Sequence, residues 1–151
     1  MKSRSVEESK PENGTINFKV NALVTTDQFI GLLESSTLGE RRPIQDRVCM
    51  EGVIANSNLI VSAWDESLLV GIARSVTDFH YACYLSDLAV HKSYQRSGIG
   101  KRLQSLTQQQ LGPLCKLILL AAPEANSYYG PLGYTHNDRG WVLDPAVRIA
   151  D

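Results

Sequence analysis

LSDLAVHKSYQRSGIGKRL, residues 85–103, is the stretch of this chain that decides the fold. It begins with the apolar positions Leu85 and Leu88–Val90, which are typical of a strand covered on both faces. The polar residues HKSYQRSG then interrupt the apolar pattern. Apolar residues return at the spacing of one helix face, at Ile99, Leu103 and Leu106. The stretch therefore predicts a strand, a turn that contains glycine and a helix.

The turn at residues 95–100 (QRSGIG) has the properties of an anion-binding site. At a helix N-terminus four backbone N–H groups lack partners within the helix, and the helix dipole is positive there. Phosphate groups bind readily at such ends. We therefore expect a phosphate ligand at this turn. The alternative is an ordinary helix start in which Gly98 and Gly100 serve only the backbone of the turn.

Two familiar phosphate loops do not match this turn because their residue spacing differs. A Walker loop ending at Lys101 needs Gly at position 95 and Ser or Thr at position 102, where the chain has Gln95 and Arg102. A dinucleotide fingerprint starting at Gly98 needs a third Gly at position 103, where the chain has Leu103. A nucleotide-binding protein that uses this loop for ATP is therefore disfavoured.

The turn resembles a different phosphate site. Gln-x-x-Gly-x-Gly directly after a Leu-x-Val strand is similar to the acetyl-CoA pyrophosphate loop of the GNAT superfamily of N-acetyltransferases. A second stretch, Ala125–Tyr134 (ANSYYGPLGY), is similar to that family's Phe-Tyr-x-x-Leu-Gly-Phe motif. The resemblance in element order covers residues 15–144. It implies the GNAT-type acyl-CoA N-acyltransferase fold of the α/β class, with a mixed sheet of about six to seven strands and about four flanking helices.

The resemblance also implies a site for acetyl-CoA as cosubstrate. In the family, the strand before the loop splays away from the next strand, and the pantetheine arm pairs with main-chain groups between them. The implied cofactor-binding residues are Leu88, Ala89, Val90, Gln95, Arg96, Ser97, Gly98, Ile99, Gly100, Lys101 and Asn126. Two alternatives stay open, namely that the strand residues only pack the core and that the basic residues are solvated helix charges.

Two residues are expected to move protons. Tyr129 matches the family tyrosine whose hydroxyl protonates the departing CoA thiolate; its alternative role is that of a half-buried structural tyrosine. An alkylamine with a pKa of ~10.4 is almost fully protonated at neutral pH, so another group must take its proton. Asp87 is the predicted base, and its alternative role is a structural carboxylate paired with Arg74. Tyr84 could orient a water.

The rest of the chain is predicted from its apolar periods and turn residues. Residues 1–14 are expected to be a disordered leader and residues 15–151 a single domain. The predicted elements are a strand at 15–20, a helix capped by Thr26 or Asp27 and running to Ser35, a helix at 44–56 opened by Pro43, a hairpin with strands at 59–64 and 68–76, a strand at 81–90, a helix at 100–111, a parallel strand at 114–122, a short helical segment after Pro123 that is ended by Gly130–Pro131 and Gly133, and one or two strands within 134–143.

Composition and charge restrict the possible partners. Hydrophobic residues make up 43% and charged residues 21%, as in soluble globular proteins. The formal net charge of -1 gives no field that would gather nucleic acid. No apolar run reaches the ~18–20 residues of a membrane span and no secretory segment is visible, so we expect a cytoplasmic protein with no membrane partner. The widely spaced Cys49, Cys83 and Cys115 predict reduced core thiols and no metal site.

The sequence thus predicts an N-acetyltransferase that moves the acetyl group of acetyl-CoA to a primary amine, of a small molecule or a protein, by direct attack in a ternary complex. The alternative is a catalytically idle acyl-CoA-binding sensor or interaction module. Arg41 and Arg42, between the first two helices, could receive a carboxylate or phosphate of the amine acceptor, or could be part of a solvated loop. A homodimer is left open.

Overall fold

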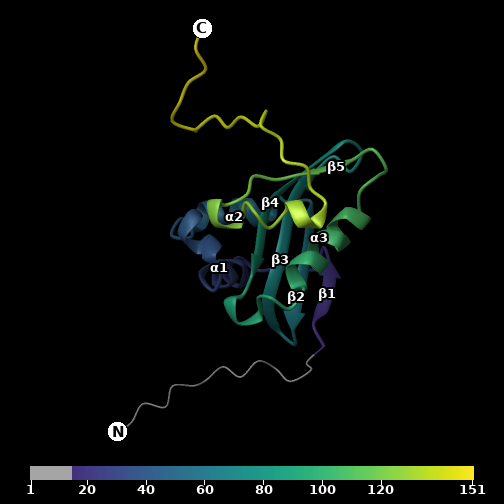
Figure 1. The fold of residues 1–151 in the computed structure, drawn as a ribbon. Helices are drawn as coiled ribbons and strands as arrows, with labels where there is room; N and C mark the ends of the chain where they lie inside the picture. Colours follow the sequence, from purple (N-terminus) through teal and green to yellow (C-terminus); the bar gives the residue numbers. More distant parts are fainter. Residues whose placement is uncertain (1–14) are drawn as a thin grey trace. The chain divides into compact units, whose positions relative to one another are not determined.

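A computed structural model describes residues 15–151, so the predicted leader at 1–14 lies outside the described residues. The chain divides into two compact units, of which the first ends at Leu120 and the second is Ala121–Asp151. The first unit holds a five-stranded sheet with three α-helices (Figure 1). The α/β class is therefore confirmed, with fewer strands and α-helices in residues 15–151 than expected. The single domain over 15–151 stays a prediction.

The elements of the first unit follow the predicted order. They are β1 (Asn17–Val20), α1 (Thr26–Glu34), the 3₁₀-helix η1 (Thr37–Arg41), α2 (Arg47–Ala55), β2 (Leu59–Asp65), β3 (Leu68–Thr77), β4 (Ala82–Val90), the 3₁₀-helix η2 (Lys92–Tyr94), α3 (Ile99–Gln109) and β5 (Lys116–Ile118). The second unit has two 3₁₀-helices, η3 (Pro123–Ala125) and η4 (Gly130–Leu132).

The strands lie in sequence order across the sheet, β1-β2-β3-β4-β5. The first three pairings are antiparallel, and β4 pairs with β5 in parallel. The predicted β2–β3 hairpin and the predicted parallel pair joined through a helix are both confirmed. After β4 the chain passes through η2 and the turn at residues 95–98 into α3, so strand, turn and helix follow in the predicted order.

Capping side chains set the starts of α1 and α2 one to three residues from the predicted positions. Thr25, rather than Thr26 or Asp27, caps α1 in a reciprocal pair with Gln28, which satisfies two backbone N–H groups. The α2 helix starts at Arg47 rather than Ile44, because residues 43–46 form a turn and the Asp46 side chain accepts from Cys49 N–H.

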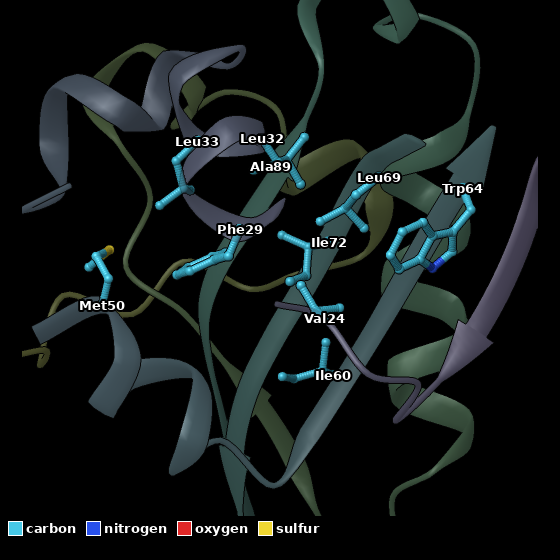
Figure 2. Close-up of a cluster of buried hydrophobic side chains, with 10 residues drawn as sticks. All are labelled: Val24, Phe29, Leu32, Leu33, Met50, Ile60, Trp64, Leu69, Ile72 and Ala89. Atoms are coloured by element: carbon cyan, nitrogen blue, oxygen red, sulfur yellow. The ribbon is translucent and has the colours of Figure 1, made fainter. Parts of the chain in front are cut away.

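Helices cover both faces of the sheet, α1 and α2 on one side and α3 on the other (Figure 1). Figure 2 shows the cluster under α1 and α2, in which Phe29 and Ile72 are fully buried and Met50 comes from α2. The predicted core position of Cys49 is wrong: it is exposed, because it precedes Met50 and the two side chains leave α2 in different directions.

The α3 helix packs unusually close to the sheet at Gly71 of β3. A Cβ placed on Gly71 would lie 3.0 Å from Ile99 Cγ2 and 3.0 Å from Leu103 Cδ1. Both of these α3 side chains are buried. The missing side chain of Gly71 therefore fixes the depth of α3, and with it the position of the turn that precedes the helix.

The second unit differs from its prediction. No strand forms within the described residues 134–143, although one or two were expected. A strand needs a neighbour to satisfy its backbone groups, and this unit contains only turns and short 3₁₀-helices. The Gly130–Pro131 pair starts η4 instead of ending a helical segment, since a proline in the first turn of a helix lacks only an N–H that has no partner within the helix.

Substitution of Gly71 by valine should destabilise the protein by about 1–3 kcal/mol, because the added methyl groups overpack the contact with α3. The measurement is urea unfolding followed by circular dichroism, with a lower midpoint and an unchanged slope.

Gly52→Ala is the matched control, since a Cβ at Gly52 on α2 meets no atom within 4 Å. It should stabilise by about 0.5–1 kcal/mol through the better helix propensity of alanine. A Gly71→Val protein as stable as wild type would show that α3 does not depend on this contact.

Candidate functional site

The two parallel strands are paired over only part of their length. The register joins Ala82, Cys83 and Tyr84 of β4 to Lys116, Leu117 and Ile118 of β5. β5 ends there, whereas β4 continues to Val90 and stays paired with β3 up to that residue. Among the described residues, no strand covers the outer edge of β4 from Leu85 to Val90. This edge offers backbone N–H and C=O groups to an extended ligand.

The open edge of β4 leads into the predicted anion site. Gly98 is the N-cap of α3, with a φ of 85°, and it makes no side-chain capping bond. Arg96 also has a positive φ, 61°. Turns of this kind direct successive N–H groups into one anion-binding concavity. The first turn of α3 therefore presents amides that no protein side chain caps.

Three hydrogen bonds hold the turn in this shape. The Gln95 side chain donates to the Val90 carbonyl at 3.0 Å, and the Ser97 hydroxyl donates to the Tyr94 carbonyl at 2.5 Å. The Tyr94 hydroxyl donates to Asp65 Oδ2 at 2.5 Å, which ties the turn to the end of β2. The Gln95 and Ser97 side chains thus support the loop, so these two predicted cofactor residues have a positioning task of their own.

The other side chains at the start of α3 differ in their exposure to solvent. Ile99 is 5% exposed and packs in the core, so it can offer a ligand only its backbone. Arg96, Lys101 and Arg102 are exposed, and within residues 15–151 none of them forms an ion pair. Their charges are available to a phosphate group at the start of α3.

The predicted base, Asp87, lies in a buried ion cluster. Arg42 Nε donates to Asp87 Oδ1 at 2.6 Å, and Arg74 Nε donates to Oδ2 at 2.5 Å. The Asp87 side chain is 1% exposed. Because each carboxylate oxygen accepts from a guanidinium and the side chain is almost fully buried, Asp87 is placed to position the Arg42 and Arg74 side chains. The geometry favours the positioning role that the pairing with Arg74 suggested, and proton transfer by Asp87 stays a hypothesis.

A β-bulge at Ser86 shapes the same region. The register pairs Arg74 with Asp87 and Ser75 with Leu85, which leaves Ser86 as the extra residue of β4. Both groups of Ser86 bind the cluster: its carbonyl accepts from Arg42 Nη2 at 2.9 Å, and its hydroxyl accepts from Arg74 Nη2 at 2.7 Å. The two arginines therefore recognise the bulge as well as the carboxylate.

The bulge also places Tyr84 and Asp87 on one face of the sheet. Tyr84 pairs with Val76, and Asp87 pairs with Arg74, two residues earlier on β3. Residues two apart on a strand share a face, as do cross-strand partners. Without the bulge, a spacing of three would put the two side chains on opposite faces. Tyr84 is 42% exposed and can reach water there.

In the second unit, Tyr129 is half-buried among aromatic rings. Its ring centroid lies 5.0 Å from that of Tyr128 and 5.4 Å from that of Tyr134. Burial, and to a smaller degree Tyr128, raises the pKa of the Tyr129 hydroxyl above its usual range. This phenol therefore keeps its proton at neutral pH. Asn126 follows η3, and its N–H bonds the Pro123 carbonyl at 3.4 Å.

Sequence reasoning missed the pairing of Arg42 with Asp87 and the role of Ser86. Arg42 and Asp87 are 45 residues apart, so no local pattern joins them. The Arg41–Arg42 pair in a loop was the only signal, and it predicted either a group that receives an anion of the acceptor or a solvated loop. No cluster of three or more His, Cys, Asp and Glu that could hold a metal ion occurs in residues 15–151. The same part of the chain has no helix long and apolar enough to cross a bilayer.

Comparison with known proteins agrees with this geometry. Residues 39–141 match the family described as "Acetyltransferase (GNAT) domain". The uncharacterized N-acetyltransferase ycf52 of Gracilaria tenuistipitata var. liui is 24% identical over 84% of this chain and 72% of its own length. A ycf52-like uncharacterized N-acetyltransferase of Prochlorococcus marinus is 31% identical over 70% of this chain and 56% of its own length.

Solved structures share the fold. A probable acetyltransferase from methicillin-resistant Staphylococcus aureus superposes with a TM-score of 0.69 at 19% identity, over 86% of this chain and 99% of its own. An aminoglycoside N-acetyltransferase in complex with CoA superposes with a TM-score of 0.68 at 16% identity, over 91% of this chain and 99% of its own. Since the family match alone spans well over half of the residues, the chain belongs to the GNAT family and is an acetyltransferase.

Proposed function

We propose that this acetyltransferase moves the acetyl group of acetyl-CoA to a primary amine by direct attack in a ternary complex. The observation that carries the proposal is the open edge of β4, followed after η2 by the uncapped start of α3. A long ligand with a phosphate group at one end and an extended amide arm suits this combination of an amide-rich turn and a free strand edge.

The roles of the binding residues follow from their positions. The amides of the 95–100 turn, with Arg96 and Lys101 nearby, would hold the pyrophosphate. The main chain of Leu88, Ala89 and Val90 would pair with the pantetheine arm, and Asn126 is proposed as a further residue that binds this arm. The relatives named above include an enzyme in complex with CoA, which supports the choice of cosubstrate.

The proposed chemistry is one acyl transfer. The neutral amine nitrogen attacks the acetyl carbonyl carbon, the carbon–sulfur bond breaks, and CoA leaves as the thiolate. Tyr129 gives its proton to that thiolate, and the proton that the amine loses passes to water, for which the exposed Tyr84 hydroxyl is a partner. Making an alkylamine neutral at pH 7 costs about 4–5 kcal/mol, so a defined exit for this proton matters.

Gly98 tests the phosphate site. Gly98→Val and Gly98→Asn should each weaken CoA binding about ten- to a hundredfold, because a side chain obstructs the backbone amides that bind phosphate. Calorimetric titration with CoA gives the affinities, and thermal unfolding gives the stabilities.

Asparagine tolerates a positive φ, so Gly98→Asn separates the obstruction from backbone strain. If Gly98→Asn binds CoA as wild type does while Gly98→Val does not, the glycine serves only the turn.

The charges at the start of α3 give a second test. Replacing Lys101 and Arg102 together by alanine should raise the KM for acetyl-CoA about three- to tenfold and make it less sensitive to salt. Lys116→Ala is the control, because Lys116 is an exposed cation on β5 that pairs with Ala82, at the end of β4 far from the start of α3. An unchanged KM in the double variant would mean that the two cations belong to the solvated face of α3.

Tyr129→Phe tests the proposed acid. The ring stays and only the hydroxyl is lost, so kcat should fall roughly ten- to a few hundredfold with little change in the KM for acetyl-CoA. In wild type, kcat should decline only above the usual phenol range near ~10, because burial raises the pKa of Tyr129.

The variant should lose this alkaline decline. Tyr128→Phe, a change in the neighbouring and more exposed ring, is the control. Equal kcat values for wild type and Tyr129→Phe would assign the proton to water or to Tyr128.

A further inference from the structure

The ion cluster around Asp87 carries an excess of positive charge. Two guanidinium groups, Arg42 and Arg74, share the single carboxylate of Asp87, which leaves a net charge of +1. The Arg74 side chain is 9% exposed and that of Arg42 is 27% exposed. Glu40, close to Arg42 in sequence, is exposed, and no acid other than Asp87 pairs with either arginine in residues 15–151.

The arginines also have donors to spare. A guanidinium has five N–H donors. Arg42 uses one on Asp87, one on the Ser86 carbonyl and one on the Arg41 carbonyl at 3.1 Å. Arg74 likewise uses one donor on Asp87, one on Ser86 and one on the Ser57 hydroxyl at 2.9 Å. Because Arg74 is buried, the donors that an incoming group can reach are those of Arg42.

The spare charge lies near the strand edge that is proposed to hold the pantetheine arm. Arg42 binds the carbonyl of Ser86, which is two residues before Leu88 on the same strand. At ~3.3 Å per residue, this carbonyl is about 7 Å from the start of the edge that would hold the pantetheine arm. An anionic group at Arg42 would therefore lie close to the proposed arm of the cosubstrate, where an acceptor has to approach.

We infer that the acceptor is an amine that also carries a carboxylate, and that Arg42 receives this carboxylate. The inference rests on the proposed function and names its acceptor class. One carboxylate balances the net charge of +1, whereas a phosphate monoester, with a charge near −2, exceeds it. An acceptor with several ammonium groups and no anion would meet repulsion from the cluster. The transfer itself is the acyl transfer described above.

Pairs of amines that differ only by a carboxylate test the inference. They are L-phenylalanine with phenethylamine, γ-aminobutyrate with propylamine, and L-lysine with cadaverine. Wild type should show a kcat/KM about ten- to a hundredfold higher for the carboxylated member of at least one pair. Arg42→Gln should bring that ratio close to one, because the guanidinium that receives the carboxylate is lost.

Two variants sharpen the result. Arg41→Gln removes a neighbouring exposed arginine and should leave the ratio unchanged. Arg42→Lys keeps the charge near Asp87 without the planar fork and should retain part of the preference, even if Arg42→Gln folds poorly. A binding measurement avoids turnover altogether: N-acetyl-L-phenylalanine should bind the CoA-saturated wild type more tightly than N-acetylphenethylamine.

Wild type that uses both members of every pair equally, or an Arg42→Gln variant that loses activity equally on both, would overturn the inference. If such a protein still binds acetyl-CoA and acetylates amines, the proposed function stands and only the acceptor class is wrong. If calorimetry detects no binding of acetyl-CoA at all, the proposed function and the inference both fail.

Discussion

The buried carboxylate of Asp87 joins three parts of the first unit that are distant in sequence. Arg42 comes from the loop that follows η1, Arg74 from β3, and Asp87 itself from β4. Removing one partner from such a cluster typically costs about 3–5 kcal/mol, since an uncompensated charge stays buried. A well-packed apolar group could stabilise the same position as effectively. Stability alone therefore does not require a charged cluster at this position, and its presence points to a role in function.

The cluster and the open strand edge depend on the same feature of β4. This strand pairs with β3 up to Val90, but with β5 only at its beginning. The bulge at Ser86 comes just after Tyr84, the last residue of β4 that pairs with β5. Arg42 binds the carbonyl of Ser86, and Arg74 binds its hydroxyl. A bulge bends its strand and disrupts the ladder locally. The arginines thus stabilise a local irregularity next to the point where the two parallel strands part.

Local sequence predicted the fold well where neighbouring residues decide the structure. The strand, turn and helix at residues 82–109 were predicted correctly because apolar spacing and glycine act within a few residues. The bulge at Ser86 was not predicted, because an extra residue changes no propensity and shows only in the register with β3. The pairing of Arg42 with Asp87 was not predicted either, because the two residues are 45 positions apart and no local pattern joins them. The strands expected at 134–143 do not form, because apolar residues alone do not supply a neighbouring strand with which the backbone can pair.

The two halves of the proposed site use different chemistry. The cosubstrate side consists of backbone amides, a strand edge and glycine conformation, which depend little on side-chain identity. The proposed acceptor side consists of the Arg42, Arg74 and Asp87 side chains, whose net charge changes with a single substitution. A backbone site can therefore be retained at the low sequence identities found among the solved relatives. If Arg42 receives the acceptor as inferred, acceptor choice can change on the same scaffold through a few charges at the bulge of β4.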